Sequence, residues 1–125
     1  MRIATRAIVH TDEGILLLKR RIGLFINHWD LPGGTLEDYD RSLEDCIIRE
    51  TLEESGLHIQ PREYTIAYSE AYKVHYFEAV TVSGEFRVNE EEFFLTPKNF
   101  FRCYEIRDMS LAFDDNKEIL LNYCR

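Results

Sequence analysis

The chain has 125 residues, of which 45% are hydrophobic and 13% aromatic. This length supports one hydrophobic core, and no long polar or repetitive tract is present, so we expect one domain over residues 1–125. Fifteen basic and 23 acidic residues give a formal net charge of −8, which disfavours nucleic acid as a partner. A small anionic substrate would also be repelled unless a bound cation reversed the local field, so the charge already points to a metal.

The cysteines and the first ten residues indicate in which cellular compartment the protein is expected. Cys46, Cys103 and Cys124 form no CxxC or CxxH pattern, so neither a disulfide framework nor a zinc cluster is predicted, and a reducing cytoplasm fits best. The first ten residues lack the apolar block of a signal peptide, and nowhere do about 18 apolar residues run together. We expect a soluble, cytoplasmic monomer or homodimer that contacts no membrane.

The first third of the chain reads as short strands and turns. Polar and apolar residues alternate over residues 3–9, which predicts a half-buried strand, and the apolar run 15–18 predicts an interior strand. The turn residues 11–14 between them favour a hairpin. Residues 20–28 are typical of a loop, and Trp29-Asp30-Leu31 is a short extended piece halted by Pro32-Gly33-Gly34.

A helix is predicted from about Ser42, whose hydroxyl can cap it, to Gly56, which suits the left-handed position after a helix. Aromatic and β-branched residues then predict strands over 57–59, 64–69, 74–82 and 100–106. Asp114 or Asp115 is expected to cap a last helix that ends near Tyr123. Strands before, between and after two helices indicate an α/β domain with a mixed β-sheet flanked by helices.

The predicted middle helix carries an unusual stripe. Spacings of three and four place six residues on one face, apolar in the first half and acidic in the second: Leu43, Cys46, Ile47, Glu50, Glu53 and Glu54. Carboxylates in a last helical turn oppose the helix dipole, and Glu50 repels Glu54 at the i,i+4 spacing. Such a breach of local rules is typical of a functional site, and clustered carboxylates suit Mg²⁺ or Mn²⁺. A solvated acidic face, with Arg49 paired to Asp45 and Glu53, explains the helix alone equally well.

The segment Arg49-Glu50-Thr51-Leu52-Glu53-Glu54-Ser55-Gly56-Leu57, which follows Pro32-Gly33-Gly34, resembles the Nudix box G-x₅-E-x₇-R-E-U-x-E-E-x-G-U, where U is a bulky apolar residue. The second half matches at every fixed position except Thr51, which stands where an apolar residue is usual. In the first half the acidic position falls on Asp40, and eight residues rather than seven separate it from Arg49. One residue is therefore inserted in the loop between residues 38 and 41, and Glu37 or Asp40 is the candidate for its carboxylate.

The resemblance to the Nudix family implies an α/β/α sandwich and a metal-dependent hydrolase. It implies that Glu53 and Glu54 are metal ligands, that Glu50 is a ligand or the base that activates water, and that Arg49 orients these carboxylates. A backbone carbonyl of Gly33 or Gly34 is expected to complete the metal shell, since glycine lets the backbone approach a ligand closely. The expected reaction is cleavage of the diphosphate linkage of a nucleoside diphosphate joined to another group: a nucleoside triphosphate, ADP-ribose or a nucleotide sugar.

Further site residues are less specific. The run Glu90-Glu91-Glu92 is the obvious source of one more carboxylate, with Glu91 as its central member, and a solvated acidic loop is the competing interpretation. Arg20 and Arg21 are candidates for binding substrate phosphates. The aromatics that are candidates for stacking on a base are too many to choose between: Phe25, Trp29, Tyr68, Tyr72 and Tyr76. The alternatives to a nucleotide hydrolase are a catalytically weak Nudix domain that binds or senses a nucleotide, and an enzyme acting on a different diphosphate.

Overall fold

The computed structural model describes all residues from 1 to 125. Its strands are β1 (Arg2–Thr11), β2 (Gly14–Leu16), β3 (Leu18–Lys19), β4 (Trp29–Asp30), β5 (Gly33–Thr35), β6 (Leu57–Tyr68), β7 (Tyr72–Gly84) and β8 (Phe100–Phe101). Its helices are α1 (Leu43–Ser55), α2 (Cys103–Ile106) and α3 (Asp114–Tyr123). None of these helices combines the length and the apolar content needed to cross a membrane.

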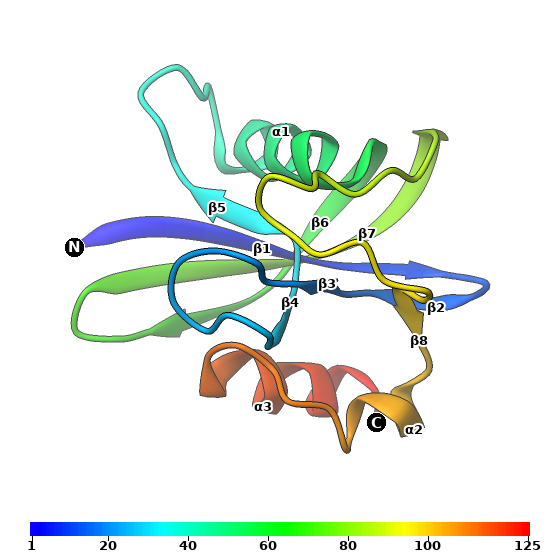
Figure 1. Cartoon of the computed structure of the whole chain (residues 1–125). Coiled ribbons are helices and arrows are strands. Elements are labelled where there is room, and N and C mark those ends of the chain that lie inside the picture. Colours follow the sequence, from blue (N-terminus) through cyan, green and yellow to red (C-terminus); the bar gives the residue numbers. More distant parts are fainter.

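The sheet is mixed, as predicted. Its order is β6-β7-β1-β2-β8, β5 also pairs with β1, and β3 and β4 form a separate two-stranded sheet. Strand β1 runs parallel to β7 and antiparallel to β2 and β5. Helix α1 covers one face of this sheet and α3 the other, so the chain is an α/β/α sandwich (Figure 1).

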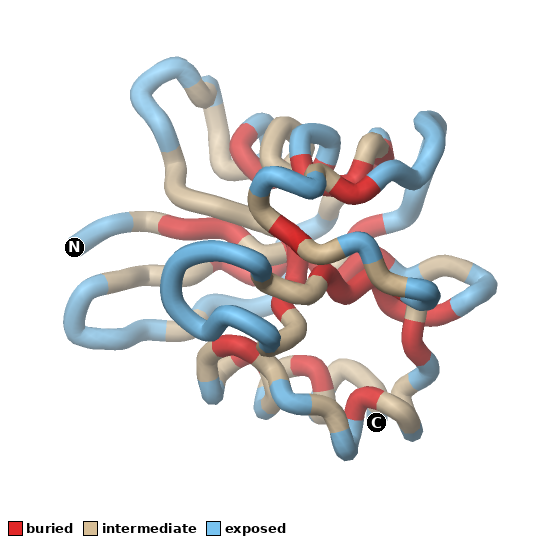
Figure 2. Tube along the Cα trace, viewed as in Figure 1, coloured by how far each residue is buried: buried red, intermediate tan, exposed pale blue.

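The two faces of β1 feed two apolar clusters, because successive side chains of a strand point to opposite sides. Ala7 and Val9 pack with Ile47 of α1, whereas Ile8 packs with Leu120 of α3. Buried residues therefore line the middle of the sheet and the inner sides of both helices (Figure 2). The core lies in two layers that share the central strands.

The local predictions for α1 are confirmed in detail. The hydroxyl of Ser42 accepts a hydrogen bond from the backbone N–H of Asp45, and Gly56 ends the helix with a φ of 73°. The hairpin of β1 and β2 also forms, with His10 opposite Ile15. The apolar run 15–18 is split between β2 and β3 at Leu17, whose N–H donates to the carbonyl of Asn99.

Three predictions differ from the structure. Residues 57–59 and 64–69 belong to one continuous strand, β6, in which register shifts after His58 and Glu63 absorb the irregular pattern. The predicted strand 100–106 ends at Phe101, because Cys103–Ile106 turns into helix α2. The first helical residue of α3 is Asp114, and the position before it is taken by Phe113, which makes no side-chain cap.

The expectation that the cysteines form no disulfide is wrong for one pair. Cys103 at the start of α2 is bonded to Cys124 at the end of α3, across a sequence separation of 21. These thiols meet because both cysteines pack against the same apolar cluster on the α3 side of the sheet, and no short spacing in the sequence marks such a pair. Cys46 is a free, buried thiol, and burial raises its pKa to about 11.

Candidate active site

The second half of α1 brings its carboxylates against the short strand β5. Cys46 and Ile47 anchor the first half of the helix in the core, and the helical period then turns Glu50 and Glu54 toward Gly33 and Gly34 of β5. Glu54 is only 4% exposed, and one of its carboxylate oxygens accepts a hydrogen bond of 2.9 Å from the N–H of Gly33.

Gly34 makes room for the second carboxylate. A Cβ atom built on Gly34 would lie 2.4 Å from the carboxyl carbon of Glu50, so a larger residue would displace this side chain. Gly33 has a φ of 155°, and a Cβ there would lie 2.0 Å from the carbonyl oxygen of Thr5 on β1. The two glycines thus let β5 pass between β1 and the acidic face of α1.

Arg49 organises the acidic side chains around it. Its guanidinium donates two hydrogen bonds to Asp40, of 2.8 and 2.9 Å, and one of 2.9 Å to Glu50. It also reaches Glu53 at 3.4 Å. Of the two loop carboxylates that the sequence offers, Glu37 and Asp40, it is Asp40 that pairs with Arg49. The pairing of Arg49 with Asp45, expected for a solvated acidic face, is not among its ion pairs, whereas the one with Glu53 is.

The segment between β7 and β8 closes over the end of α1. The N–H of Arg87 donates to the carbonyl of Ser55, and the N–H of Asn89 donates to that of Glu54, so two free carbonyls of the last helical turn are satisfied (Figure 1). Asn89 then hydrogen-bonds the carboxylate of Glu92 at 3.3 Å. These contacts place Glu92, rather than its two acidic neighbours, where its charge acts on Glu50 and Glu54.

Mutual repulsion and burial shape the protonation of these groups. Burial raises the pKa of Glu54 well above its usual value, and the N–H of Gly33 only partly opposes this. Burial also raises the pKa of Glu50 against the opposing charge of Arg49, and burial followed by the charge of Glu53 raises the pKa of Glu92. These three carboxylates therefore have too little positive charge around them to balance their ionised forms.

The donor set fits a hard divalent cation, although it is not gathered into a finished metal site. No group of three or more His, Cys, Asp and Glu side chains is arranged to hold a metal ion. Instead, Arg49 draws Glu50 and Glu53 toward itself, and Gly33 holds Glu54. Yet the groups that converge here are carboxylates, which are the ligands that Mg²⁺ and Mn²⁺ prefer, and Glu54 has a single backbone N–H to balance its buried charge.

The two arginines and the loop carboxylate predicted to meet substrate have different surroundings. Arg20 donates to Asp30 at 2.7 Å and to the carbonyl of Leu24. Arg21 donates to the carbonyl of Glu90 and so supports the acidic loop. Glu91 is exposed and lines a shallow cavity that also contains Glu53.

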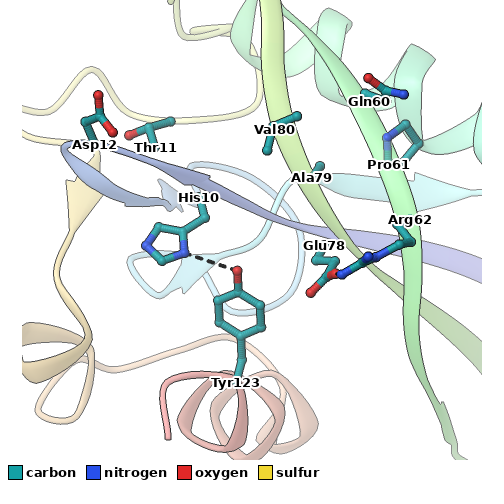
Figure 3. Close-up of a pocket in the computed structure, with 10 residues that line it drawn as sticks. All are labelled: His10, Thr11, Asp12, Gln60, Pro61, Arg62, Glu78, Ala79, Val80 and Tyr123. Carbon is teal, nitrogen blue, oxygen red and sulfur yellow. Dashed lines mark hydrogen bonds and ion pairs between the residues drawn. The ribbon is translucent and has the colours of Figure 1, made fainter.

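Several other cavities lie outside the acidic face of α1. One, of about 350 Å³, lies on the α3 side of the sheet and is lined in part by Arg6, Arg20 and Phe113. A larger one, of about 840 Å³, is open to solvent between the end of α3 and strands β6 and β7. In this open cavity His10 points to the hydroxyl of Tyr123, and Arg62 is paired with Glu78 (Figure 3). Its charged pair is thus already satisfied, and none of the α1 carboxylates lines it.

Sequence reasoning missed several residues near the site. Arg6 alternates with apolar residues in β1, so the sequence indicated only its place in a strand. In the structure its Nε atom lies 3.7 Å from Oδ1 of Asp30. Asn116 joins Asp30 to Tyr76 through two buried hydrogen bonds. These contacts join segments 40 and 86 residues apart, so no local spacing could reveal them.

Comparison with known proteins gives a consistent result. A family model described as the NUDIX domain matches residues 1–121. Among solved structures, a NUDIX hydrolase from Nitrosomonas europaea superposes with a TM-score of 0.79 at 23% identity, covering 98% of this chain and 69% of that one. A MutT NUDIX hydrolase from Burkholderia pseudomallei gives 0.77 at 22% identity, with 97% and 95% covered. An ADP-ribose pyrophosphatase from Streptococcus suis gives 0.68 at 22% identity, with 99% and 92% covered.

Proposed function

The chain belongs to the Nudix family and is a Nudix hydrolase, and from this premise we propose that it cleaves the diphosphate linkage of a nucleoside diphosphate joined to another group. The proposed cofactor is Mg²⁺, with Mn²⁺ as a substitute, since Nudix hydrolases generally use divalent metals. The similar structures include proteins named as a MutT hydrolase, an ADP-ribose pyrophosphatase and a UDP-X diphosphatase. We therefore include nucleoside triphosphates, ADP-ribose and nucleotide sugars among the candidate substrates.

The observation that carries this proposal is the burial of Glu54 with one backbone donor, beside three further carboxylates that repel one another: Glu50, Glu53 and Glu92. Burying an ionised carboxylate without a compensating charge costs free energy, so this arrangement does not stabilise the fold in the absence of a cation. A divalent cation would supply the missing charge. It would also lower the pKa of a bound water and reduce the repulsion between the diphosphate and its attacker.

The chain's own groups have separable roles in this proposal. Glu53, Glu54 and the Gly33 backbone carbonyl are the proposed metal ligands. Glu50 is a further ligand or the base that takes the proton from water, and its raised pKa moves it toward the range that suits a base. Arg49 holds Glu50 and Glu53 in place, and Glu92 is the loop carboxylate that we favour.

Arg20, Arg21 and Glu91 remain candidates for substrate contact. Arg20 lines the cavity of about 350 Å³ and keeps part of its guanidinium free of the bonds to Asp30 and Leu24. Arg21 and Glu91 belong to the acidic loop and its support, where they would adjust the position of Glu92.

The test is hydrolysis of a panel of nucleoside triphosphates, ADP-ribose and nucleotide sugars, with Mg²⁺, with Mn²⁺ and with the metals chelated, followed by mass spectrometry of the products. We expect metal-dependent release of a nucleoside monophosphate and a phosphorylated second product. Glu53→Gln should abolish this turnover, because it removes a proposed ligand. Glu44→Gln, on an exposed position of the same helix, is the matched control and should retain it. Unchanged turnover in Glu53→Gln would refute the mechanism.

The second candidate function is a catalytically weak Nudix domain that binds or senses a nucleotide. Thr51 favours it, since this residue departs from the family pattern and its buried hydroxyl has no hydrogen-bond partner. Tight binding of a nucleotide without product formation in the same panel would select this function.

The proposed partner is a small nucleotide-like diphosphate, with no nucleic acid, and a monomer or homodimer remains the predicted state. The predicted cytoplasmic location has lost one of its supports, because persistent disulfides are rare in a reducing compartment. Trapping free thiols at the moment of cell lysis would show whether Cys103 and Cys124 are bonded there.

A further inference from the structure

The three cysteines of the chain differ in their access to solvent. Cys46 is buried, and burial raises the pKa of its thiol to about 11, so the thiol stays protonated at neutral pH and reacts slowly. Cys103 and Cys124 are bonded to each other, and both are partly exposed. Thiol–disulfide exchange requires that a thiolate reach one of the two sulfurs. Small thiols in solution therefore have access to this bond, whereas Cys46 is shielded from them.

The disulfide closes a covalent loop that contains α2, α3 and the segment between them. This disulfide loop spans residues 103–124, and the Cα atoms of the two cysteines are 5.7 Å apart, an ordinary separation for a bonded pair. Both cysteines pack against the apolar cluster on the α3 side of the sheet, and the two helices lie together on that side (Figure 1). The disulfide loop is therefore the layer that covers this face of the sheet.

The disulfide loop supplies one wall of the cavity of about 350 Å³, which Phe113 and Asn116 both line. The guanidinium groups of Arg6 and Arg20 lie over the aromatic ring of Phe113, at 5.7 and 5.8 Å. Asn116 donates to one carboxylate oxygen of Asp30 at 2.8 Å, and the other oxygen accepts from Arg20 at 2.7 Å. The position of α3 therefore influences the position of Arg20.

The backbone of Phe113 depends on being held from both sides. Its φ of 62° is a left-handed conformation, which costs free energy for a bulky side chain and persists only where the surrounding structure fixes it. On one side, Ala112 donates its N–H to the carbonyl of Trp29 at 2.7 Å. On the other side, Asn116 donates its N–H to the carbonyl of Phe113 at 3.2 Å. A looser α3 would let Phe113 relax and leave the two guanidinium groups.

We propose that Cys103 and Cys124 are a reversible redox switch that regulates substrate binding. In the oxidised protein the disulfide loop is closed, and α3 keeps Phe113 and Arg20 in their observed positions. In the reduced protein the loop is open, α3 separates from the sheet more often, and substrate binds more weakly. The effect on substrate rests on the proposed function, in which Arg20 is a candidate for substrate contact.

The oxidant that closes the loop is a peroxide or a small-molecule disulfide. With hydrogen peroxide, the thiolate of one cysteine attacks an oxygen atom, the O–O bond breaks, and a sulfenic acid and one water form. The second thiol then attacks that sulfur, so that the S–S bond forms and a second water leaves. The two sulfurs lose two electrons in all, and the peroxide gains them. Two small thiols reverse the reaction by exchange and leave as a small-molecule disulfide.

The first experiment needs no substrate. Thiol-trapping mass spectrometry counts the free thiols of the native protein before and after treatment with dithiothreitol, and hydrogen–deuterium exchange is measured on both forms. We expect dithiothreitol to open the bond, and amides of residues 103–124 then to exchange faster by up to about 100-fold, the factor for releasing a loop of this length. Amides of α1 should not change, and reoxidation with hydrogen peroxide should restore slow exchange.

Two variants are the controls for this experiment. The double variant Cys103→Ser with Cys124→Ser should exchange like the reduced protein and respond to neither reagent. Cys46→Ser should keep the full response, because the switch does not involve this residue. A native bond that dithiothreitol leaves closed, or equal exchange of residues 103–124 in the oxidised and reduced protein, would overturn the switch and leave a purely structural disulfide.

The second experiment measures kcat and KM of the oxidised and reduced protein, with Mg²⁺ and the substrate that the panel identifies. We expect reduction to raise KM by about 5-fold or more. The kcat should change little, since the carboxylates of α1 lie on the other side of the sheet (Figure 1). An unchanged KM, or a loss confined to kcat, would overturn the regulation of substrate binding and leave the proposed function intact. If no compound of the panel is hydrolysed, the proposed function fails, and the exchange measurements still decide whether the redox switch exists.

Discussion

Asp40 and Arg49 form the most fully paired ion pair of the site. Asp40 accepts two hydrogen bonds from the guanidinium and a third, of 2.9 Å, from the N–H of Glu37. Its side chain is 3% exposed, and the ring of Tyr39 covers the guanidinium at 4.9 Å. The inserted loop residue thus does not disrupt the pair, and the loop folds so that Asp40 still reaches Arg49.

This pair should make stability depend on pH in a defined window. The hydrogen bonds from Arg49 lower the pKa of Asp40 from 3.8 to about 2. Since the folded state favours the ionised form, the stabilisation is complete above pH 4 and is lost as the pH falls toward 2. We expect Asp40→Asn to reduce the free energy of unfolding at neutral pH by about 2 kcal/mol. Urea unfolding measured between pH 2 and 7 should show this deficit shrinking below pH 4, and a deficit that stays constant over that range would contradict the prediction.

At the residue scale, the sequence predicted the carboxylates of α1 because their positions follow from the helical period alone. The roles of Glu50, Glu53 and Glu54 as ligands stay predictions, but the structure places Glu54 beside Gly33 and Glu50 beside Gly34. The choice among Glu90, Glu91 and Glu92 did not follow from the sequence. It depends on Asn89, which fixes Glu92 by a tertiary contact at the end of α1.

At the scale of elements, the last two helices depend on a covalent link. The bond between Cys103 and Cys124 joins the start of α2 to the end of α3. A disulfide that closes a loop of this length stabilises a fold by about 3 kcal/mol in the chain-entropy model. Because α3 carries Asp115 and Asn116, the link also restrains one wall of the cavity that contains them.

Replacing both bonded cysteines by serine should therefore lower the free energy of unfolding by about 3 kcal/mol. Urea unfolding with and without a reductant measures this. The reductant should destabilise the unmodified protein and leave the double variant unchanged, since Cys46 is already a free thiol. Equal stability of the oxidised protein and the double variant would show that the link contributes nothing.

Elements with a strong local pattern were predictable and those set by tertiary contacts were not. The caps of α1 were identified correctly because Ser42 and Gly56 act within one turn of the helix. The strand predicted over 100–106 was too long, because the chain turns into α2 after Phe101. That turn depends on Cys103 and Ile106, which pack against the α3 side of the sheet. The family resemblance supplied the layer order, which local patterns left open.

At the scale of the whole molecule, two apolar layers share one sheet. Phe77 of β7 packs in the layer under α1, while its neighbour Tyr76 packs in the layer under α3. Loss of either layer exposes the same strands, so the layers should unfold together. The prediction that residues 1–125 form one domain likewise implies that they unfold in a single transition.

The single tryptophan, Trp29, provides the measurement, because it packs beside the α3 layer with its ring 4.9 Å from that of Phe101. We expect Trp29 fluorescence, which reports on the α3 layer, and far-UV circular dichroism, which reports on all helices and strands, to give the same midpoint in urea. An earlier midpoint for Trp29 would mean that the α3 layer unfolds separately and that the chain is not one cooperative unit.

The account as a whole requires a divalent cation at the acidic end of α1. Titration of the chelator-treated protein with Mn²⁺, followed by electron paramagnetic resonance, measures this binding without any substrate. We expect saturable binding that Glu54→Gln weakens at least about 10-fold, and that Glu44→Gln on the same helix leaves unchanged. Absence of saturable binding in the unmodified protein, or equal affinity in Glu54→Gln, would contradict the account.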